Sequence, residues 1–177
     1  TLFNNIEIKK DDEVMKVPLA YGPKQKFLAR LEQMADPTNK RVQITLPRIS
    51  FEIQGISYDP TRQLPKTNNI NKAIEGTILN RNKIFAGVPY LISFQLSVFA
   101  KQQDDALQVI EQIIPFFNPQ YTLTIKPFSL YSDIKQDVPI TLTGVVMADD
   151  FEGAMEASRR TIIYTLDFDM QIYFHGP

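Results

Sequence analysis

The last part of the chain carries a long alternation of apolar and polar residues that is typical of a β-strand. Between residues 161 and 174, large apolar side chains occupy every second position, and Thr, Asp or Gln fill most positions between them. Successive side chains of a strand point to opposite faces of a sheet, so this spacing places the apolar set on one face. The apolar positions are Ile162, Tyr164, Leu166, Phe168, Met170, Ile172 and Phe174.

Shorter alternating segments predict the remaining strands. They cover residues 6–8, 15–19, 48–58, 90–99, 121–125 and 138–146. The first two flank a charged run and predict a hairpin, in which Pro18 indicates an edge position. The alternation that begins at Arg48 resumes after Gly55 in a shifted phase, which predicts a β-bulge there.

Two segments have the three- and four-residue apolar spacing of helices. Pro23 favours the first turn of one helix, whose stripe is Phe27, Leu28, Leu31 and Met34. The other helix follows Asp104 and Asp105, either of which can act as its N-cap. Its expected buried face is Leu107, Ile110, Ile113 and Ile114. We therefore predict an α+β fold in a single domain over 1–177, with a mixed, largely antiparallel β-sheet packed against two main helices.

The segment 59–87 is too polar to fill a core and too long for an ordinary connection. We expect an extended loop or hairpin arm that protrudes from the domain, since long loops in compact domains are usually functional or disordered. Weak pairing of 77–79 with 83–85 is one expectation within it. Its positive charge is explained by a solvated loop or, alternatively, by a partner contact. The candidate interface residues here are Lys66, Thr67, Asn68, Arg81 and Lys83.

The sequence offers little for catalysis, metal binding or cofactor binding. There is no Cys, and the single His, His175, lies next to the terminus, where we expect fraying. The acidic pairs 11–12, 104–105 and 149–150 lack EF-hand spacing and fit a turn, a helix start and a strand connection. No glycine-rich phosphate loop is present. We therefore expect no catalytic, metal or cofactor-binding residues.

The net charge and the hydropathy limit the classes of partner that we expect. The chain has 19 basic and 20 acidic residues, for a net charge of −1. A non-specific nucleic-acid binder usually has a basic excess, which this chain lacks. No apolar run approaches the roughly 18 to 20 residues that a membrane span needs, so no membrane partner is expected.

Several collinear segments give the chain a family resemblance. They are Leu2–Ile6, Val17–Tyr21, Leu46–Ile49, Leu96–Phe99 with Asp104-Asp105, Glu111–Pro119, Asp137–Ile140 and Ser158–Arg160. Together they resemble the proximal tail sheath stabiliser, or tail terminator, of T4-like phages with contractile tails. The segment 59–87 matches poorly beyond Lys66-Thr67-Asn68.

The resemblance implies a structural protein of the virion, assembled in the host cytoplasm. Such proteins form a hexameric ring that caps the head-proximal end of the tail. The implied partners are other copies of the chain, the tail sheath protein, the tail tube terminator and the neck or head-completion proteins. DNA passes through the ring without specific binding. Arg159 and Arg160 are further candidate interface residues, because the planar fork of arginine suits protein contacts.

Other functions stay open on the sequence alone. One is another phage connector, such as a head-completion or baseplate ring protein, because fold does not fix function. A small metal-dependent hydrolase that uses the acidic pairs is a second alternative. A nucleic-acid-binding module is disfavoured by the charge.

Overall fold

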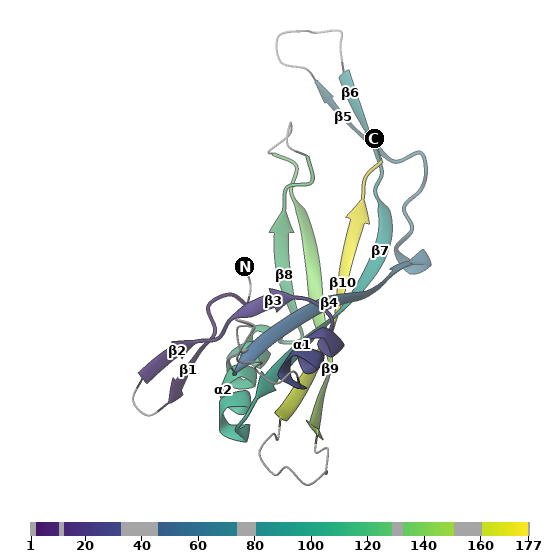
Figure 1. Ribbon diagram of the computed structural model, residues 1–177. Helices are drawn as coiled ribbons and strands as arrows, with labels where there is room; N and C mark the ends of the chain where they lie inside the picture. Colours follow the sequence, from purple (N-terminus) through teal and green to yellow (C-terminus); the bar gives the residue numbers. More distant parts are fainter. Residues whose placement is uncertain are drawn as a thin grey trace, which may run out of the picture.

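One six-stranded sheet with unusually long central strands forms the body of the protein (Figure 1). The computed structural model describes residues 3–10, 13–32, 46–73, 81–128, 133–150 and 161–176. The strands run in the order β3 (Leu19–Tyr21), β4 (Arg48–Tyr58), β7 (Val88–Ala100), β10 (Thr161–Phe174), β9 (Gln136–Asp150) and β8 (Gln120–Ile125). All neighbours are antiparallel except β3 and β4.

Both the long final strand and the bulge that the sequence predicts are confirmed. β10 occupies the centre of the sheet between β7 and β9. In β4, Ile53 pairs with Phe94 and Gly55 with Ser93, which leaves Gln54 as the extra residue of the bulge. A second register shift lies in β9, where Thr143 is the extra residue opposite Asp167 and Phe168 of β10. Bulges increase local twist, which is consistent with the curl of this sheet.

The main core lies between one face of the sheet and helix α2 (Gln103–Ile113). Leu96, Val98, Leu166 and Phe168 of β7 and β10 are fully buried there. The helix contributes Ala106, Val109, Ile110 and Ile113 to this core.

The predicted buried face of α2 is wrong at two positions. Leu107 and Ile114 are 41% and 40% exposed. Ile114 begins the 3-10 turn η2 (Ile114–Phe116), whose tighter winding takes it off the helical stripe. The predicted cap is also wrong, because Gln102 is the N-cap residue. Asp105 is instead buried in the first turn, with Oδ2 3.5 Å from Lys10 Nζ.

The prediction of two main helices is wrong as well. Helix α1 (Lys24–Glu32) has 9 residues and covers only one end of the opposite sheet face, where Phe27 packs on Phe99 and Ile163. The Phe27 and Phe99 ring centroids are 5.9 Å apart. The predicted α+β class is therefore also wrong, because the fold is mostly β, a curled half-barrel sheet with one main helix. The long strands bury their apolar faces largely against α2 and one another, so a second large helix is not needed for the core.

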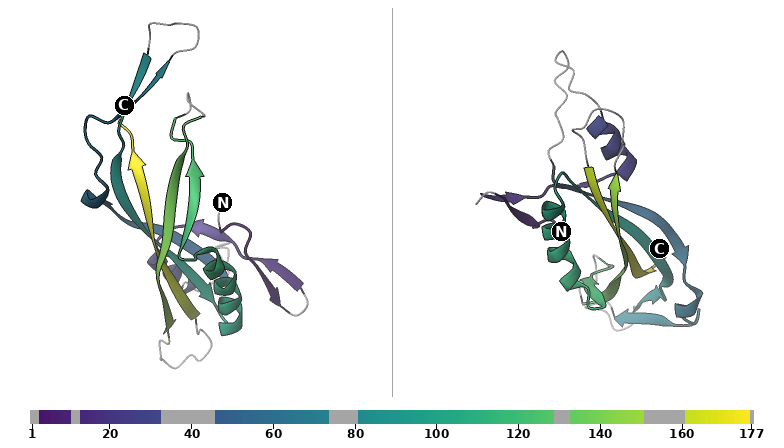
Figure 2. Two further views of the ribbon diagram at one scale, coloured as in Figure 1. Left: turned by 180° about the vertical axis from the view of Figure 1, so that it is seen from behind. Right: turned by 90° about the horizontal axis from the view of Figure 1, so that it is seen from below.

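Two hairpins extend from this body (Figures 1 and 2). β1 (Glu7–Lys10) and β2 (Glu13–Lys16) form the first, as predicted, and Gln108 Oε1 of α2 accepts a hydrogen bond from Lys9 N at 2.9 Å. β5 (Asn69–Ala73) and β6 (Arg81–Phe85) form the second, beyond the ends of β7 and β10 near the C-terminus. The predicted partner of 83–85 is wrong, since these residues pair with 69–71.

Candidate interaction surfaces

Residues 63–87 include the β5–β6 hairpin, and we call them the arm; they follow a turn that is held by an ion pair. Pro60–Arg62 forms the short helix η1, and Asp59 Oδ1 accepts a hydrogen bond from Thr61 N at 3.0 Å. Arg62 Nε donates to Asp59 Oδ2 at 2.7 Å, and its Nη2 donates to the Tyr90 carbonyl at 3.0 Å. The hydrogen bond from Arg62, aided by Thr61, lowers the pKa of Asp59 below its usual value.

The other root of the arm packs on the end of β10. Ala86 N donates to the Asn68 carbonyl at 3.2 Å, and the His175 ring nitrogen Nδ1 lies 3.4 Å from the Phe85 carbonyl. The His175 ring also packs on Phe128, with centroids 4.9 Å apart. A Cβ on Gly87 would lie 2.8 Å from Tyr173 Cβ, so this position needs glycine. We expected His175 to be frayed, but in the structure its ring contacts both the Phe85 carbonyl and the Phe128 ring.

Sequence reasoning missed Arg62, although it links three parts of the chain. Its guanidinium carbon also lies 5.1 Å from the Tyr173 ring centroid, which is a cation–π distance. The signal that could have found it is Asp59-Pro60, an N-capping residue followed by a first-turn proline, with Arg62 three residues after the acid. Arg62 therefore ties the turn that precedes the arm to β7 and β10.

The structure brings most of the predicted interface residues to the arm. Lys66, Thr67 and Asn68 are exposed just before β5, and Arg81 begins β6. Lys83 is exposed in β6, with its Nζ 5.1 Å from the Phe85 ring centroid. Arg159 and Arg160 lie outside the described residues, so they are not placed relative to the arm.

One face of the sheet beyond α1 is polar and carries carboxylates, and we call it the polar face. Gln95 Nε2 donates to Asp167 Oδ1 at 2.8 Å, and Ser93 Oγ donates to Asp169 Oδ1 at 2.7 Å. Glu52 lies on the same face, paired in register with Gln95. Within the described part of the chain, no Lys or Arg lies within salt-bridge distance of these three carboxylates.

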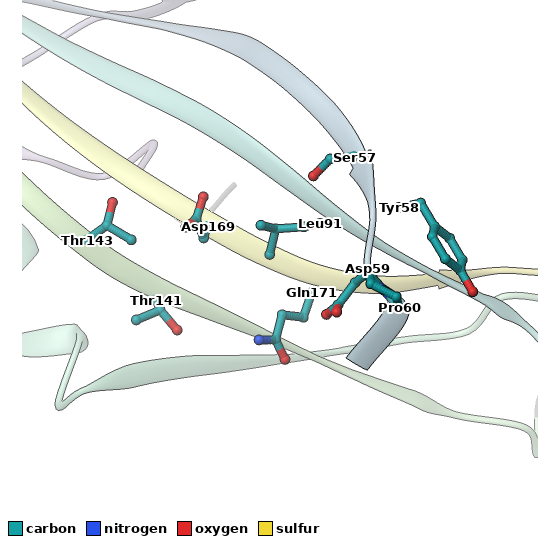
Figure 3. Close-up of a pocket in the computed structure, with 9 residues that line it drawn as sticks. All are labelled: Ser57, Tyr58, Asp59, Pro60, Leu91, Thr141, Thr143, Asp169 and Gln171. Atoms are coloured by element: carbon teal, nitrogen blue, oxygen red, sulfur yellow. The ribbon is translucent and has the colours of Figure 1, made fainter. Parts of the chain in front are cut away.

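A groove opens on this polar face at the end nearest the arm's root (Figure 3). Its volume is about 380 Å³. Most of its lining residues have polar side chains, and four strands supply them together with the turn at Asp59. The lining residues are Ser57, Tyr58, Asp59, Pro60, Leu91, Thr141, Thr143, Asp169 and Gln171.

The opposite face carries an apolar strip that continues past the end of α2. Its members are exposed by 41% to 57%, although all lie on the face that forms the core farther along the strands. The Tyr90 ring links the strip, with centroids 6.0 Å from Tyr58 and 5.3 Å from Phe174. Contiguous exposed apolar patches of this kind mark interaction sites. The strip consists of Ile53, Ile56, Tyr58, Val88 and Phe174.

The described residues hold no group of three or more His, Asp or Glu side chains placed to bind a metal ion. No helix in the described ranges is both long and apolar enough to cross a membrane. Of the acidic pairs, Asp104 accepts a hydrogen bond from Gln108 and Asp105 pairs with Lys10, while the side chains at 11–12 and 149–150 lie outside the described set.

Comparison with known proteins gives two matches. The model of the T4-like virus Myoviridae tail sheath stabiliser family matches residues 1–177. The tail completion protein gp15 of enterobacteria phage T4 is 27% identical over 195 residues, which cover 99% of this chain and 67% of that protein. Both matches include the sheet, α2 and the arm.

Proposed function

We propose that this chain, which belongs to the T4-like virus Myoviridae tail sheath stabiliser family, forms a hexameric ring at the head-proximal end of the tail. The family resemblance that the sequence suggests is confirmed by the match over the whole chain. The protein is a structural component of the phage tail and not an enzyme. Its place is in the virion.

In this proposal the ring binds the last ring of sheath subunits and the tube terminator. It stops polymerisation and offers a surface to the neck proteins that join tail to head. DNA passes through the ring without specific binding. The net charge of −1 supports this role, because a strongly basic lumen would hold the phosphate backbone through many contacts.

The observation that carries the ring proposal is the uncovered apolar strip together with open strand edges. β3 pairs only with Ile49–Phe51 of β4, so the edge from Glu52 to Tyr58 has no partner strand among the described residues. The edge of β8 that faces away from β9 likewise has no partner strand among the described residues. Exposed edges and apolar patches favour association. Two different surfaces of one subunit suit the head-to-tail contacts of a ring.

Sedimentation velocity and negative-stain imaging of the purified protein, alone and added to tails, test this proposal. We expect closed six-membered rings at high concentration or on the tail. The Ile56→Asp variant should fail to assemble because it places a charge in the apolar strip. Leu107→Asp, at an exposed position on α2, is the control and should assemble normally.

A strictly monomeric protein that also sits as a single copy in the tail would overturn the ring proposal. Arg159 and Arg160 are proposed as a further contact with a neighbouring subunit or the sheath. Their joint change to Glu should impair assembly while leaving the circular dichroism and melting temperature of the subunit unchanged. Normal assembly by that double variant would remove them from the interface.

A further inference from the structure

The arm and the polar face carry opposite charges that the described part of one subunit leaves unpaired. We infer that the polar face of each subunit receives the positively charged arm of the adjacent subunit. This inference rests on the proposed ring and specifies which surfaces meet within it.

The arm carries a net positive charge, whereas the rest of the chain is net negative. Residues 63–87 contain four basic residues and one acidic residue, whereas the whole chain has a net charge of −1. The arm thus has a net charge of +3 and the remainder −4. Lys66 and Lys83 are exposed, and neither has a carboxylate within salt-bridge distance among the described residues. The basic residues are Lys66, Lys72, Arg81 and Lys83, and the acidic one is Glu75.

The negative charge on the polar face is held in a fixed geometry. Neutral donors, the Gln95 amide and the Ser93 hydroxyl, orient the carboxylates of Asp167 and Asp169 across two strands. Asp167 and Asp169 are half-buried on the central strand β10, so they change position little when a partner binds. Carboxylates held in this way are oriented to form charge-assisted hydrogen bonds with Lys or Arg side chains of a partner.

The groove on the same face complements the polar residues of the arm. Ser57, Thr141, Thr143 and Gln171 line it with hydroxyl and amide groups. The arm presents Asn69 and Asn71 in a row along β5, where Asn71 Nδ2 donates to Asn69 Oδ1 at 3.2 Å. Amides both donate and accept, so they match a lining of this kind. Polar rims with about one hydrogen bond per 100–200 Å² are typical of protein interfaces.

The β5–β6 hairpin points away from the sheet of its own subunit, which makes the polar face of a second copy its binding site in this inference. Figures 1 and 2 show the arm leaving the end of β7 and β10 and pointing away from the sheet. Its root is fixed by the Arg62–Asp59 ion pair and by the bond from Ala86 N to the Asn68 carbonyl. An arm on one subunit and a face on the next make a heterologous contact, and repetition of that contact can close a ring.

Charge exchange between two variants tests the pairing. The arm variant is Lys66→Glu with Lys83→Glu, and the face variant is Asp167→Lys with Asp169→Lys. Each alone should raise the concentration for half-maximal ring formation by at least about tenfold, which corresponds to about 1.4 kcal/mol. An equimolar mixture should recover rings in which the two variants alternate, because each altered arm then meets an altered face. Mass photometry with one variant carrying a mass tag reads the composition.

Matched controls separate this contact from general charge effects. Glu111→Lys and Lys101→Glu each reverse one charge at an exposed position elsewhere and should assemble normally. If lysine on β10 unfolds the subunit, Asp167→Asn with Asp169→Asn keeps the side-chain shape and should still weaken rings. In the wild type, added salt should weaken assembly because it screens exposed charges.

The outcomes distinguish this inference from the ring proposal. If wild-type protein forms rings but neither variant weakens them, or the mixture does not recover them, the arm does not bind the polar face. Rings that survive the face variant while sheath capping is lost would assign the face to another partner and overturn the inference. If wild type forms no ring alone or on tails, the proposed function itself fails.

Discussion

Two adjacent isoleucines at the end of α2 allow the packing of that helix to be tested directly. Ile113 is 1% exposed and belongs to the main core, whereas Ile114 is 40% exposed in η2. Changing Ile113 to Ala removes three buried carbon atoms, which costs about 2.4 kcal/mol in transfer free energy alone. The cavity left beside α2 raises the expected loss to about 3–4 kcal/mol, within the range of about 2–5 for such changes.

Ile114→Ala is the matched control, since the chemistry is identical and the position differs by one residue. Part of this side chain already contacts water and the surface can relax, so we expect a loss of about 1 kcal/mol or less. Urea denaturation of both variants, at a concentration where sedimentation shows monomers, gives the two free energies of unfolding. Losses that agree within about 0.5 kcal/mol, or a larger loss for Ile114→Ala, would refute the described orientation of α2.

Three further predictions concern the arm and its root. Gly87→Ala should lower the free energy of unfolding by about 1–3 kcal/mol, because the new Cβ would lie 2.8 Å from Tyr173 Cβ. Gly55→Ala is the control and should be near neutral, because no atom lies within 4 Å of the added Cβ. Equal effects of the two substitutions would contradict this packing. The lowered folded-state pKa of Asp59 means that its contribution to stability is present above the unfolded pKa of about 3.9 and is lost as pH falls through the folded value. An NMR titration should therefore find the pKa of Asp59 below its ordinary value in the wild type and closer to that value in Arg62→Gln, and identical pKa values in the two proteins would exclude the ion pair. Deletion of Lys66–Lys83 should leave a folded subunit with near-native melting temperature but weaken ring formation or sheath capping, and normal capping would show that the arm is dispensable.

The parts of the fold that depend on a strict two-residue period could be predicted from the sequence. Burial of one face of β10 requires an apolar residue at every second position from Ile162 to Phe174, and no other structure fits that spacing. The phase shift around Gly55 likewise indicates one extra residue, because a strand must regain its register after a bulge. The alternating runs 121–125 and 138–146 also correspond to strands, although β9 is longer at both ends.

The helical face and the arm depend on tertiary contacts that periodicity does not encode. In α2 both Ile113 and Ile114 are apolar, so two overlapping stripes fit the sequence, and only packing on β7 and β10 selects Ile113. In the arm, Lys83–Phe85 could pair with either of two weak segments, and the structure selects the more distant Asn69–Asn71. Arg62 acts through Tyr90 and Tyr173, which are remote in sequence, so no local pattern reveals its full role.

The proposed role of this tail protein is a hexameric ring at the head-proximal end of the tail. Electron cryo-microscopy of complete tails, with the protein tagged at its C-terminus, tests it most directly. We expect six copies in one closed ring against the last sheath ring, with each arm on the polar face of the next subunit. A different copy number, or a position in the baseplate or within the head, would contradict it.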